Sequence, residues 1–437
     1  MIDLAASLLC LNPVLTNTPL NQLICIAKAM LSMSGRVTML GISRWTNKGG
    51  SYRTVQRFFG SVLPWSKLQW FFIGHHLLNK DDTIVLAGDE TVVTKAGKKT
   101  HGLDRFFSSL YGKAVPGVAF FALSLISTKD RTSYPIMIEQ VVKEPKEQKR
   151  KEKKKKRSPG RPKGSKNKNK RQVELSPQLL MIQTMIRSLQ ALIGVKLPLV
   201  YCVLDGAFGH NAALQMLRQC GLHLISKLRY DAALYFRYTG PQKKAGANRK
   251  YGDKLNYECI PRRYLKSETT NKGIRERIYQ MTMLSRSFPD PINVVILVKT
   301  NLKKKTHARV VFVSSDLALG YETLIDYYRL RFQIEFNFRD AKQYWGLEDF
   351  MNVTQRSVYN GANLSFFMVN LSRALIVDFR NDHPDFSVND LKAHYRGAKY
   401  VEEVLKLLPE KAEPILIERV FSKVLALGSV NILPKAA

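Results

Sequence analysis

Apolar positions recur every three or four residues along the first part of the chain. Over residues 1–78 this spacing is clearest at Leu20, Leu23, Ala27 and Met30. Such a period matches one face of an α-helix. The pattern therefore predicts a mainly helical N-terminal region.

Continuous apolar runs then replace the helical spacing. They occupy residues 83–88, 118–126 and 134–142. Short apolar runs are typical of buried strands, and three in close succession favour an antiparallel meander.

Strand and helix signals alternate further along. Ser176 and Pro177 form a favourable N-cap and first helical position. A strand at 199–204, a helix at 210–219 and a strand at 222–228 follow. This succession predicts parallel strands covered by helices.

The remaining chain divides into two parts. Residues 229–320 return to strand signals, and from residue 321 onward the spacing is helical, including the largely apolar stretch 364–379. We therefore expect an α/β core that a β-rich stretch interrupts and a helical region follows.

One segment differs from all of these. Residues 143–171 hold 16 Lys and Arg against three Glu, with almost no apolar side chains. Its Pro and Gly residues disfavour a helix, so we expect a solvated, disordered loop.

Composition narrows the class of protein. The chain has 437 residues, of which 45% are hydrophobic, enough for a core in more than one structural unit. The formal net charge of +34 points to nucleic acid as the partner. The apolar run 114–127 is too short and too broken to span a bilayer, so no membrane partner is expected. Five scattered cysteines and the lack of a secretory signal favour a reduced, cytoplasmic protein without structural zinc.

Two carboxylates come directly after predicted strands. Asp89 follows 83–88, and Asp205 follows 199–204. Open α/β sheets bind ligands at strand ends, so both side chains could face one crevice. A strand-end Asp is also a common turn residue, and each Asp alone leaves both interpretations open.

A third region carries a spaced row of polar residues. Tyr328, Arg331, Glu335 and Lys342 have offsets of 3, 4 and 7, which places them on one side of a helix beside an apolar stripe. The alternative is a row of ion pairs one turn apart. The residues expected on the far, solvent-facing side are Gln333, Asn337 and Asp340.

This row, Tyr-x2-Arg-x3-Glu-x6-Lys, resembles the signature of the bacterial insertion-sequence-four group of DDE transposases. Asp89-Glu-Thr91 with Lys95 resembles the group's first motif, and Asp205-Gly-Ala-Phe-Gly209 resembles its second. The resemblance covers roughly residues 80–350. It implies an α/β fold with an RNase H-like catalytic core, a β-rich insertion domain and helical N- and C-terminal regions.

The resemblance also implies divisions of the chain. They are a helical DNA-binding region at 1–78, the first part of the core at 79–228, an insertion domain at 229–320, the last core helix at 321–350 and a helical region at 351–437.

By the same resemblance, Asp89, Asp205 and Glu335 would be catalytic and would hold two Mg²⁺ ions, with Mn²⁺ as a substitute. Magnesium prefers oxygen ligands and keeps several waters, so three carboxylates suffice. Tyr328 and Arg331 would bind a phosphate or an unstacked base, and Lys342 would contact the terminal phosphates. The residues expected to be mere surface charges are Glu90, Asp326 and Asp340.

Two other elements suggest DNA contacts. The segment 159–166 resembles an AT-hook, which would place Arg161 in the minor groove of A·T-rich DNA; the alternative is a merely solvated Lys-rich loop. The segment 51–59 could be a recognition helix with Arg53 and Arg57 one turn apart.

These observations predict a transposase that cuts and joins double-stranded DNA at the ends of an insertion sequence. It would act as a homodimer on DNA, in the bacterial cytoplasm near the nucleoid. One alternative is an RNase H-like nuclease such as a junction resolvase, which would not call for the Tyr and Arg beside the Glu. The other is a non-catalytic DNA-binding protein derived from a transposase.

Overall fold

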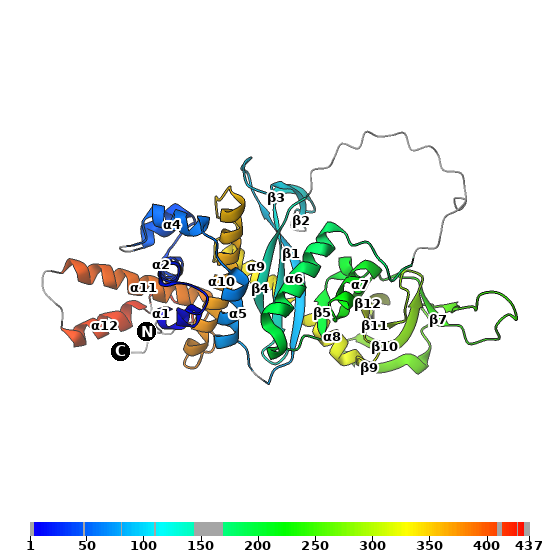
Figure 1. Ribbon diagram of the computed structural model, residues 1–437. Helices are drawn as coiled ribbons and strands as arrows, with labels where there is room; N and C mark the ends of the chain where they lie inside the picture. Colours follow the sequence, from blue (N-terminus) through cyan, green and yellow to red (C-terminus); the bar gives the residue numbers. More distant parts are fainter. Residues whose placement is uncertain are drawn as a thin grey trace.

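The computed structural model describes residues 4–46, 49–79, 81–108, 111–143, 169–408, 413–425 and 427–431. The molecule is elongated, with helices at one end, a sheet across the middle and a β-rich part at the other end (Figure 1). Most of the basic segment expected to be a disordered loop, with Arg161, lies outside the described residues.

Helices from both ends of the chain build one helical body. The N-terminal ones are α1 Leu4–Leu8, α2 Asn17–Ser32, α3 Met39–Trp45, α4 Tyr52–Gly60 and α5 Trp65–His76, and the C-terminal ones are α10 Gln355–Arg380, α11 Val388–Leu407 and α12 Pro414–Leu425. Helix α2 packs on α11, while α4 and α5 pack on α10. The buried rings of Trp65 and Phe367 lie 6.1 Å apart across this contact. The two terminal regions, expected as separate units, therefore share one core.

The centre of the sheet follows the predicted meander and βαβ unit. Its strands are β1 Ile84–Thr94, β3 Lys113–Ser127, β4 Thr132–Val141, β5 Tyr201–Leu204 and β6 His223–Leu228. Strand β3 runs antiparallel between β4 and β1, and β1, β5 and β6 are parallel neighbours. A further strand, β2 Asp104–Ser108, pairs with the start of β3. The sequence pattern missed β2 because only one of its five side chains is buried.

The β-rich stretch continues this same sheet. Its strands are β7 Leu234–Arg237, β8 Tyr251–Lys254, β9 Leu265–Asn271, β10 Ile274–Ser285, β11 Ile292–Asn301 and β12 Thr306–Ser314. Strand β12 pairs antiparallel with β6, so that the described chain forms one sheet of twelve strands. The expected insertion is therefore joined to the core by backbone hydrogen bonds.

Helices cover both faces of the sheet and create two cores. Helices α6 Pro177–Ile193 and α7 Asn211–Gln219 lie on one face, and α8 Tyr321–Leu330, α9 Gln333–Gln343 and α10 lie on the other. Successive side chains of β1 alternate between them: Leu86 is buried with Ile182 of α6, and Val85 is buried with Ile334 of α9. This is the period of two that a strand imposes.

The row from Tyr328 to Lys342 does not lie on one helix, and this prediction is wrong. Helix α8 ends at Leu330, Arg331 caps it, and α9 begins at Gln333. Between them the N–H of Phe332 bonds to the carbonyl of Arg329, three residues back. A turn of this 3₁₀ type is tighter than an α-turn and divides the helix in two.

Two helices, Pro177–Lys196 and Gln355–Arg380, are long and apolar enough by length and composition to cross a membrane. Within the protein, 72% of the apolar window of the second helix is buried. The first packs Leu179, Ile182 and Ile186 into the core on its face of the sheet. Both therefore serve as core helices of this fold.

Candidate active site

Strand pairing brings Asp89 and Asp205 together. In the parallel ladder of β1 and β5, Gly88 lies opposite Leu204, and the two carboxylates come next on each chain. Neighbouring strands are about 4.8 Å apart. The backbone therefore places both acidic residues side by side where β5 ends. Asp205 follows its strand as predicted, but β1 continues to Thr94, so the prediction that Asp89 follows its strand is wrong.

A rigid turn fixes Asp205. Its Oδ1 accepts a hydrogen bond of 3.0 Å from the backbone N–H of Ala207, which caps a short 3₁₀ turn. Its carbonyl accepts a 2.6 Å bond from the hydroxyl of Ser226 on β6. At Gly209, a Cβ atom would stand 1.9 Å from the carbonyl of Lys227, so only glycine allows this approach. The Asp-Gly-Ala-Phe-Gly motif thus holds the carboxylate at the sheet edge.

Arg331 links the third carboxylate to the first. Its Nη1 is paired with Oδ2 of Asp89, and its Nη2 lies 3.3 Å from Oε1 of Glu335. The Arg331 side chain is only 14% exposed, whereas Glu335 is 46% exposed. The guanidinium therefore sits between the carboxylates that β1 and α9 contribute.

Electrostatics couple all four residues. Burial raises the pKa of Asp89, and the Arg331 guanidinium opposes this rise while Asp205 and Glu335 add to it. Burial also pulls the pKa of Arg331 down, but the neighbouring Asp89, followed by Tyr328, Glu335 and Asp205, outweighs burial, and the pKa of Arg331 is raised. Asp205 and Glu335 are thus close enough for their charges to act on Asp89, and a cation among the three carboxylates would stabilise their negative charge.

The donor set suits a magnesium-like ion. Among the described residues, no three His, Cys, Asp or Glu side chains are close enough together to form a metal site as they stand. The three carboxylates nevertheless offer the oxygen ligands that Mg²⁺ prefers, and a buried Asp89 gains from a neighbouring cation. Arg331 supplies that positive charge in this structure.

A cavity of about 470 Å³ opens beside Asp89 and Asp205. Glu90 also lines it, although its side chain was expected to be a mere surface charge. The carboxylate of Glu90 accepts a 2.9 Å bond from Gln178 of α6, and burial, followed by the charge of Asp89, raises its pKa. The strand alternation alone assigns Glu90 to the other face. Both side chains line the same cavity, and Glu90 does so on the side of α6, where Gln178 binds it.

Tyr328 lies inside the core rather than on an open face. The residue is 9% exposed, and the centroid of its ring lies 5.2 Å from that of the Phe312 ring. Its hydroxyl is buried and has no hydrogen-bond partner among the described residues. The Nζ of Lys227 lies 5.4 Å from the ring centroid. Contact between Tyr328 and DNA stays a prediction.

The side-chain amine of Lys342 already has partners within the protein. Its Nζ donates a 2.8 Å bond to the carbonyl of Val92 on β1 and lies 3.6 Å from Oε1 of Glu348. A phosphate contact by Lys342 would therefore have to compete with these partners, and this role stays a prediction.

The prediction that Gln333, Asn337 and Asp340 form a solvent-facing side is also wrong. Asn337 is fully buried and donates bonds of 2.9 Å to Ser133 and 3.3 Å to Ser124. Asp340 is 8% exposed and accepts from Arg339. The cause is that α9 packs on β4 and β1 as well as on α10. Asp326, by contrast, is a surface charge as predicted, paired at 2.9 Å with Arg131.

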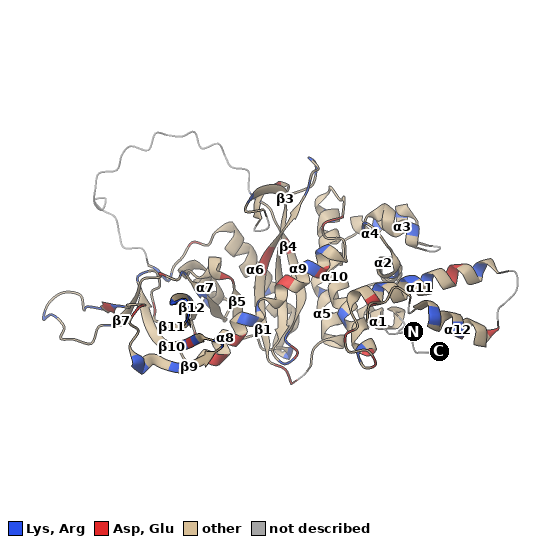
Figure 2. Ribbon diagram, turned by 180° about the vertical axis from the view of Figure 1, so that it is seen from behind, with Lys and Arg blue, Asp and Glu red and all other residues tan. Residues whose placement is uncertain are grey.

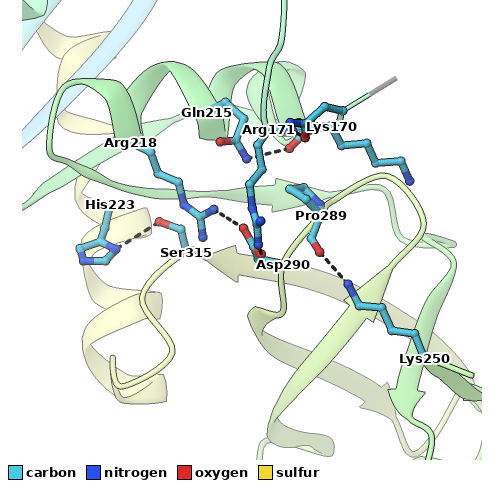
Figure 3. A network of polar contacts seen from close by, with 11 residues as sticks. Lys170, Arg171, Gln215, Arg218, His223, Lys250, Pro289, Asp290 and Ser315 are labelled. Carbon is cyan, nitrogen blue, oxygen red and sulfur yellow. Dashed lines mark hydrogen bonds and ion pairs between the residues drawn. The ribbon is translucent and has the colours of Figure 1, made fainter. Parts of the chain in front are cut away.

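The two ends of the basic segment are fastened near the cavity. On one side, Nζ of Lys143 lies 4.2 Å from the ring centroid of Phe106, and its charge acts on Glu90. On the other side, Arg171 and Arg218 each bond to Asp290 at 2.6 Å, as Figure 3 shows. These two arginines lower the pKa of Asp290.

Arg53 and Arg57 lie away from this site. Both are exposed on α4, which begins at its N-cap Ser51 and belongs to the helical body (Figure 1). The recognition-helix role stays a prediction. So does the role of Arg161, which lies outside the described residues.

Lys95 holds the chain that follows α9. Its Nζ donates bonds of 3.0 Å to the carbonyl of Glu348 and 2.7 Å to that of Phe350, and it lies 3.8 Å from the Phe350 ring centroid. Burial lowers the pKa of Lys95 to about 8.

This pKa predicts a measurable pH dependence. Between about pH 8 and pH 10 the unfolded chain binds the Lys95 proton more often than the folded protein does, so the free energy of unfolding should rise with pH. Lys95→Met should reduce that slope, as urea titrations at pH 8, 9 and 10 would show. Equal slopes for both proteins would mean that Lys95 keeps an ordinary pKa.

The comparisons with known proteins agree with this geometry. A search of curated proteins finds no match. A family model described as DDE superfamily endonuclease matches residues 10–284, which is more than half of the chain. The match includes Asp89 and Asp205, while Glu335 lies beyond its end. Because this family model matches more than half of the chain and includes Asp89 and Asp205, the chain belongs to the DDE superfamily endonuclease family.

Proposed function

We propose that this protein is a DNA transposase of the insertion-sequence-four type, which cleaves the ends of an insertion sequence and joins them to a new site. The observation that carries this proposal is the gathering of Asp89, Asp205 and Glu335 around Arg331. The first two are fixed by strand pairing, and the third lies four residues after the arginine.

The three carboxylates would hold divalent metal ions, two Mg²⁺ or Mn²⁺ in our proposal. When bound, such ions activate a water molecule and stabilise the leaving oxygen of a phosphodiester. Arg331 neutralises Asp89 and Glu335 in their absence. Once other cations take over those carboxylates, the guanidinium is free to hold a phosphate of the DNA by two parallel hydrogen bonds.

The order of the central strands supports an RNase H-like core. Strands β4, β3 and β1 form the antiparallel part, and β5 and β6 continue it in parallel. The acidic residues sit where β1 passes the end of β5, which is where open α/β sheets bind ligands.

Charge supports double-stranded DNA as the partner. Lys and Arg occur in the helical body and in the β-rich part alike, as Figure 2 shows, so the surplus of +34 is not confined to one region. Cutting at two ends of an element also calls for two copies of the chain on one DNA. We propose a homodimer on DNA that works in the bacterial cytoplasm at the nucleoid.

The test is to map nicks. The protein is incubated with Mg²⁺ and the DNA that flanks its own gene, and strand breaks and joined products are located by sequencing. Paired breaks at repeated end sequences, with joined products, are expected. Breaks only at branched junctions would favour the resolvase alternative. Binding without breaks in Mg²⁺ or Mn²⁺ would favour the non-catalytic alternative.

The basic segment predicts a separate effect on affinity. Residues 144–168 hold 13 Lys and Arg against three Glu. Replacing them with a short Gly/Ser linker keeps Lys143, Lys170 and Arg171, so the melting temperature should hardly change. The slope of log K against log salt should shrink by about 0.9 for each DNA phosphate that the protein no longer neutralises. Identical slopes would show that the segment does not touch DNA.

Within that segment, Arg161→Ala should remove any preference for A·T-rich duplexes if it enters the minor groove. Competition between A·T-rich and G·C-rich duplexes, with Lys163→Ala as the control, measures this preference.

A further inference from the structure

A second cavity, of about 1140 Å³, lies at the C-terminal end of β1. It is bounded by the segment after β1, by the β2–β3 ribbon and by the chain between α9 and α10. We call it the basic groove, after the cationic residues that line it: Arg36, Lys95, Lys98, Lys99 and Lys113.

The walls of the basic groove are held by hydrogen bonds. The Nζ of Lys95 donates hydrogen bonds to the carbonyls of Glu348 and Phe350, in the chain between α9 and α10. The backbone N–H of His101 donates a 2.9 Å bond to the carbonyl of Val353 in that same chain. The carbonyl of His101 in turn accepts 2.7 Å from Gln140 of β4. The groove is therefore part of the folded structure.

The basic groove has a positive net charge, and three of its lysines are exposed to solvent. Two carboxylates line it, but Asp349 is bound to Arg36 and to the N–H of Val37, and Glu348 lies beside Lys342. Lys98, Lys99 and Lys113 are exposed, and none of them has a side-chain hydrogen bond or ion pair within the described ranges. Three lysine side chains thus face solvent around one cavity, which is typical of a site that binds a polyanion.

A line of cations connects the groove to the active site. Along β1, Arg331 is paired with Asp89, Lys342 is bonded to Val92, and Lys95 follows the last residue of the strand. Asp89 and Lys95 are six residues apart, which is about 20 Å along a strand. Phosphates of one DNA strand are spaced by about 3.4 Å along the axis of the duplex, so for a duplex that runs parallel to β1 this length corresponds to about six base pairs.

We propose that the basic groove binds the phosphate backbone of double-stranded DNA about six base pairs from the bond that is cut. The position rests on the proposed function, whereas the binding itself does not. Lys98, Lys99 and Lys113 contact phosphates. Lys95 holds the chain between α9 and α10, which forms one wall of the groove. The contact adds affinity and fixes the direction in which the duplex leaves the active site.

The first test measures binding without cleavage. The groove variant Lys98→Ala/Lys99→Ala/Lys113→Ala is compared with the control Lys67→Ala/Lys129→Ala/Lys196→Ala, whose three lysines are also exposed and lie elsewhere. Affinity for a random duplex of about 40 base pairs is titrated against salt in EDTA. The slope of log K against log salt should fall by about 1.8 to 2.7 in the groove variant, for two or three phosphates, and by less than about 0.9 in the control.

Two further measurements keep the result interpretable. The variant Lys98→Arg/Lys99→Arg/Lys113→Arg should keep the wild-type slope, and all three variants should melt at the wild-type temperature. An equal reduction of the slope in the groove and control variants would overturn the groove as a DNA site. It would leave the proposed function untouched, because no cleavage is measured.

The second test addresses position. Where nicks have been mapped, phosphates whose ethylation weakens wild-type binding but not binding by the groove variant should cluster about six base pairs from the nick. A cluster at the nick itself, or more than about ten base pairs away, would overturn the placement. If the reduced slope persists while no nick is found anywhere, the groove stands as a DNA site and the transposase proposal fails.

Discussion

Asp205→Asn is expected to lower DNA cleavage at least about 10³-fold while leaving the fold and DNA binding intact. The amide oxygen of Asn can still accept the bond from the N–H of Ala207, so the cap of the short turn survives. The substitution removes one negative charge beside Asp89. The measurement is the rate of nicking at mapped sites in Mg²⁺, with affinity determined separately in EDTA.

The matched control is Asp326→Asn, which also removes one carboxylate but from an exposed ion pair with Arg131. It should cut at the wild-type rate. Asp89→Asn and Glu335→Gln should behave like Asp205→Asn. A variant among these three that still cuts at nearly the wild-type rate would show that its residue is not a ligand.

Arg331→Ala is expected to have two effects, one on stability and one on catalysis. Without divalent metal, Asp89 and Glu335 lose their only close cation among the described residues, so the free energy of unfolding should fall by about 2 kcal/mol. This figure is discounted for the 46% exposure of Glu335. With Mg²⁺, cleavage should drop about 10²-fold because no guanidinium then holds the DNA phosphate.

Magnesium itself distinguishes this role from that of a helix-supporting ion pair. In the wild-type protein a bound cation must displace the guanidinium, whereas in Arg331→Ala the carboxylates are free. Mg²⁺ should therefore raise the melting temperature of the variant more than that of the wild type. Arg339→Ala is the control and should respond to Mg²⁺ like the wild type. It removes an exposed arginine of α9 whose one ion pair within the described part of the chain is with Asp340. An equal Mg²⁺ response in Arg331→Ala and the wild type, or a variant that does not fold at all, would favour the simple ion pair.

Local patterns were enough to find the elements that carry the site. The apolar runs before Asp89 and Asp205 predicted β1 and β5, because a buried strand must be apolar on both faces. Ligand binding at strand ends suggested that Asp89 and Asp205 could face one crevice, whereas the pairing of β1 with β5 that brings them together is a feature of the folded sheet. The spacing of Arg331 and Glu335 likewise predicted their contact, which is an i,i+4 pair across the break between α8 and α9.

Other features depend on partners that are distant in sequence. Helical spacing placed Asn337 on the solvent-facing side, yet its amide is buried and donates hydrogen bonds to Ser124 and Ser133, about two hundred residues earlier. Glu90 was expected to be a surface charge, yet it lines the cavity beside Asp89 and binds Gln178 of α6.

The largest arrangements are also tertiary. The pairing of Arg331 with Asp89 crosses from α8 to β1, and no spacing along the chain encodes it. The union of N- and C-terminal helices rests on contacts such as that of Trp65 with Asn360, at 2.8 Å. The continuation of the sheet through β12 rests on its pairing with β6. Periodicity records which face of an element avoids water, whereas the identity of the neighbour on that face is settled only when distant segments pack.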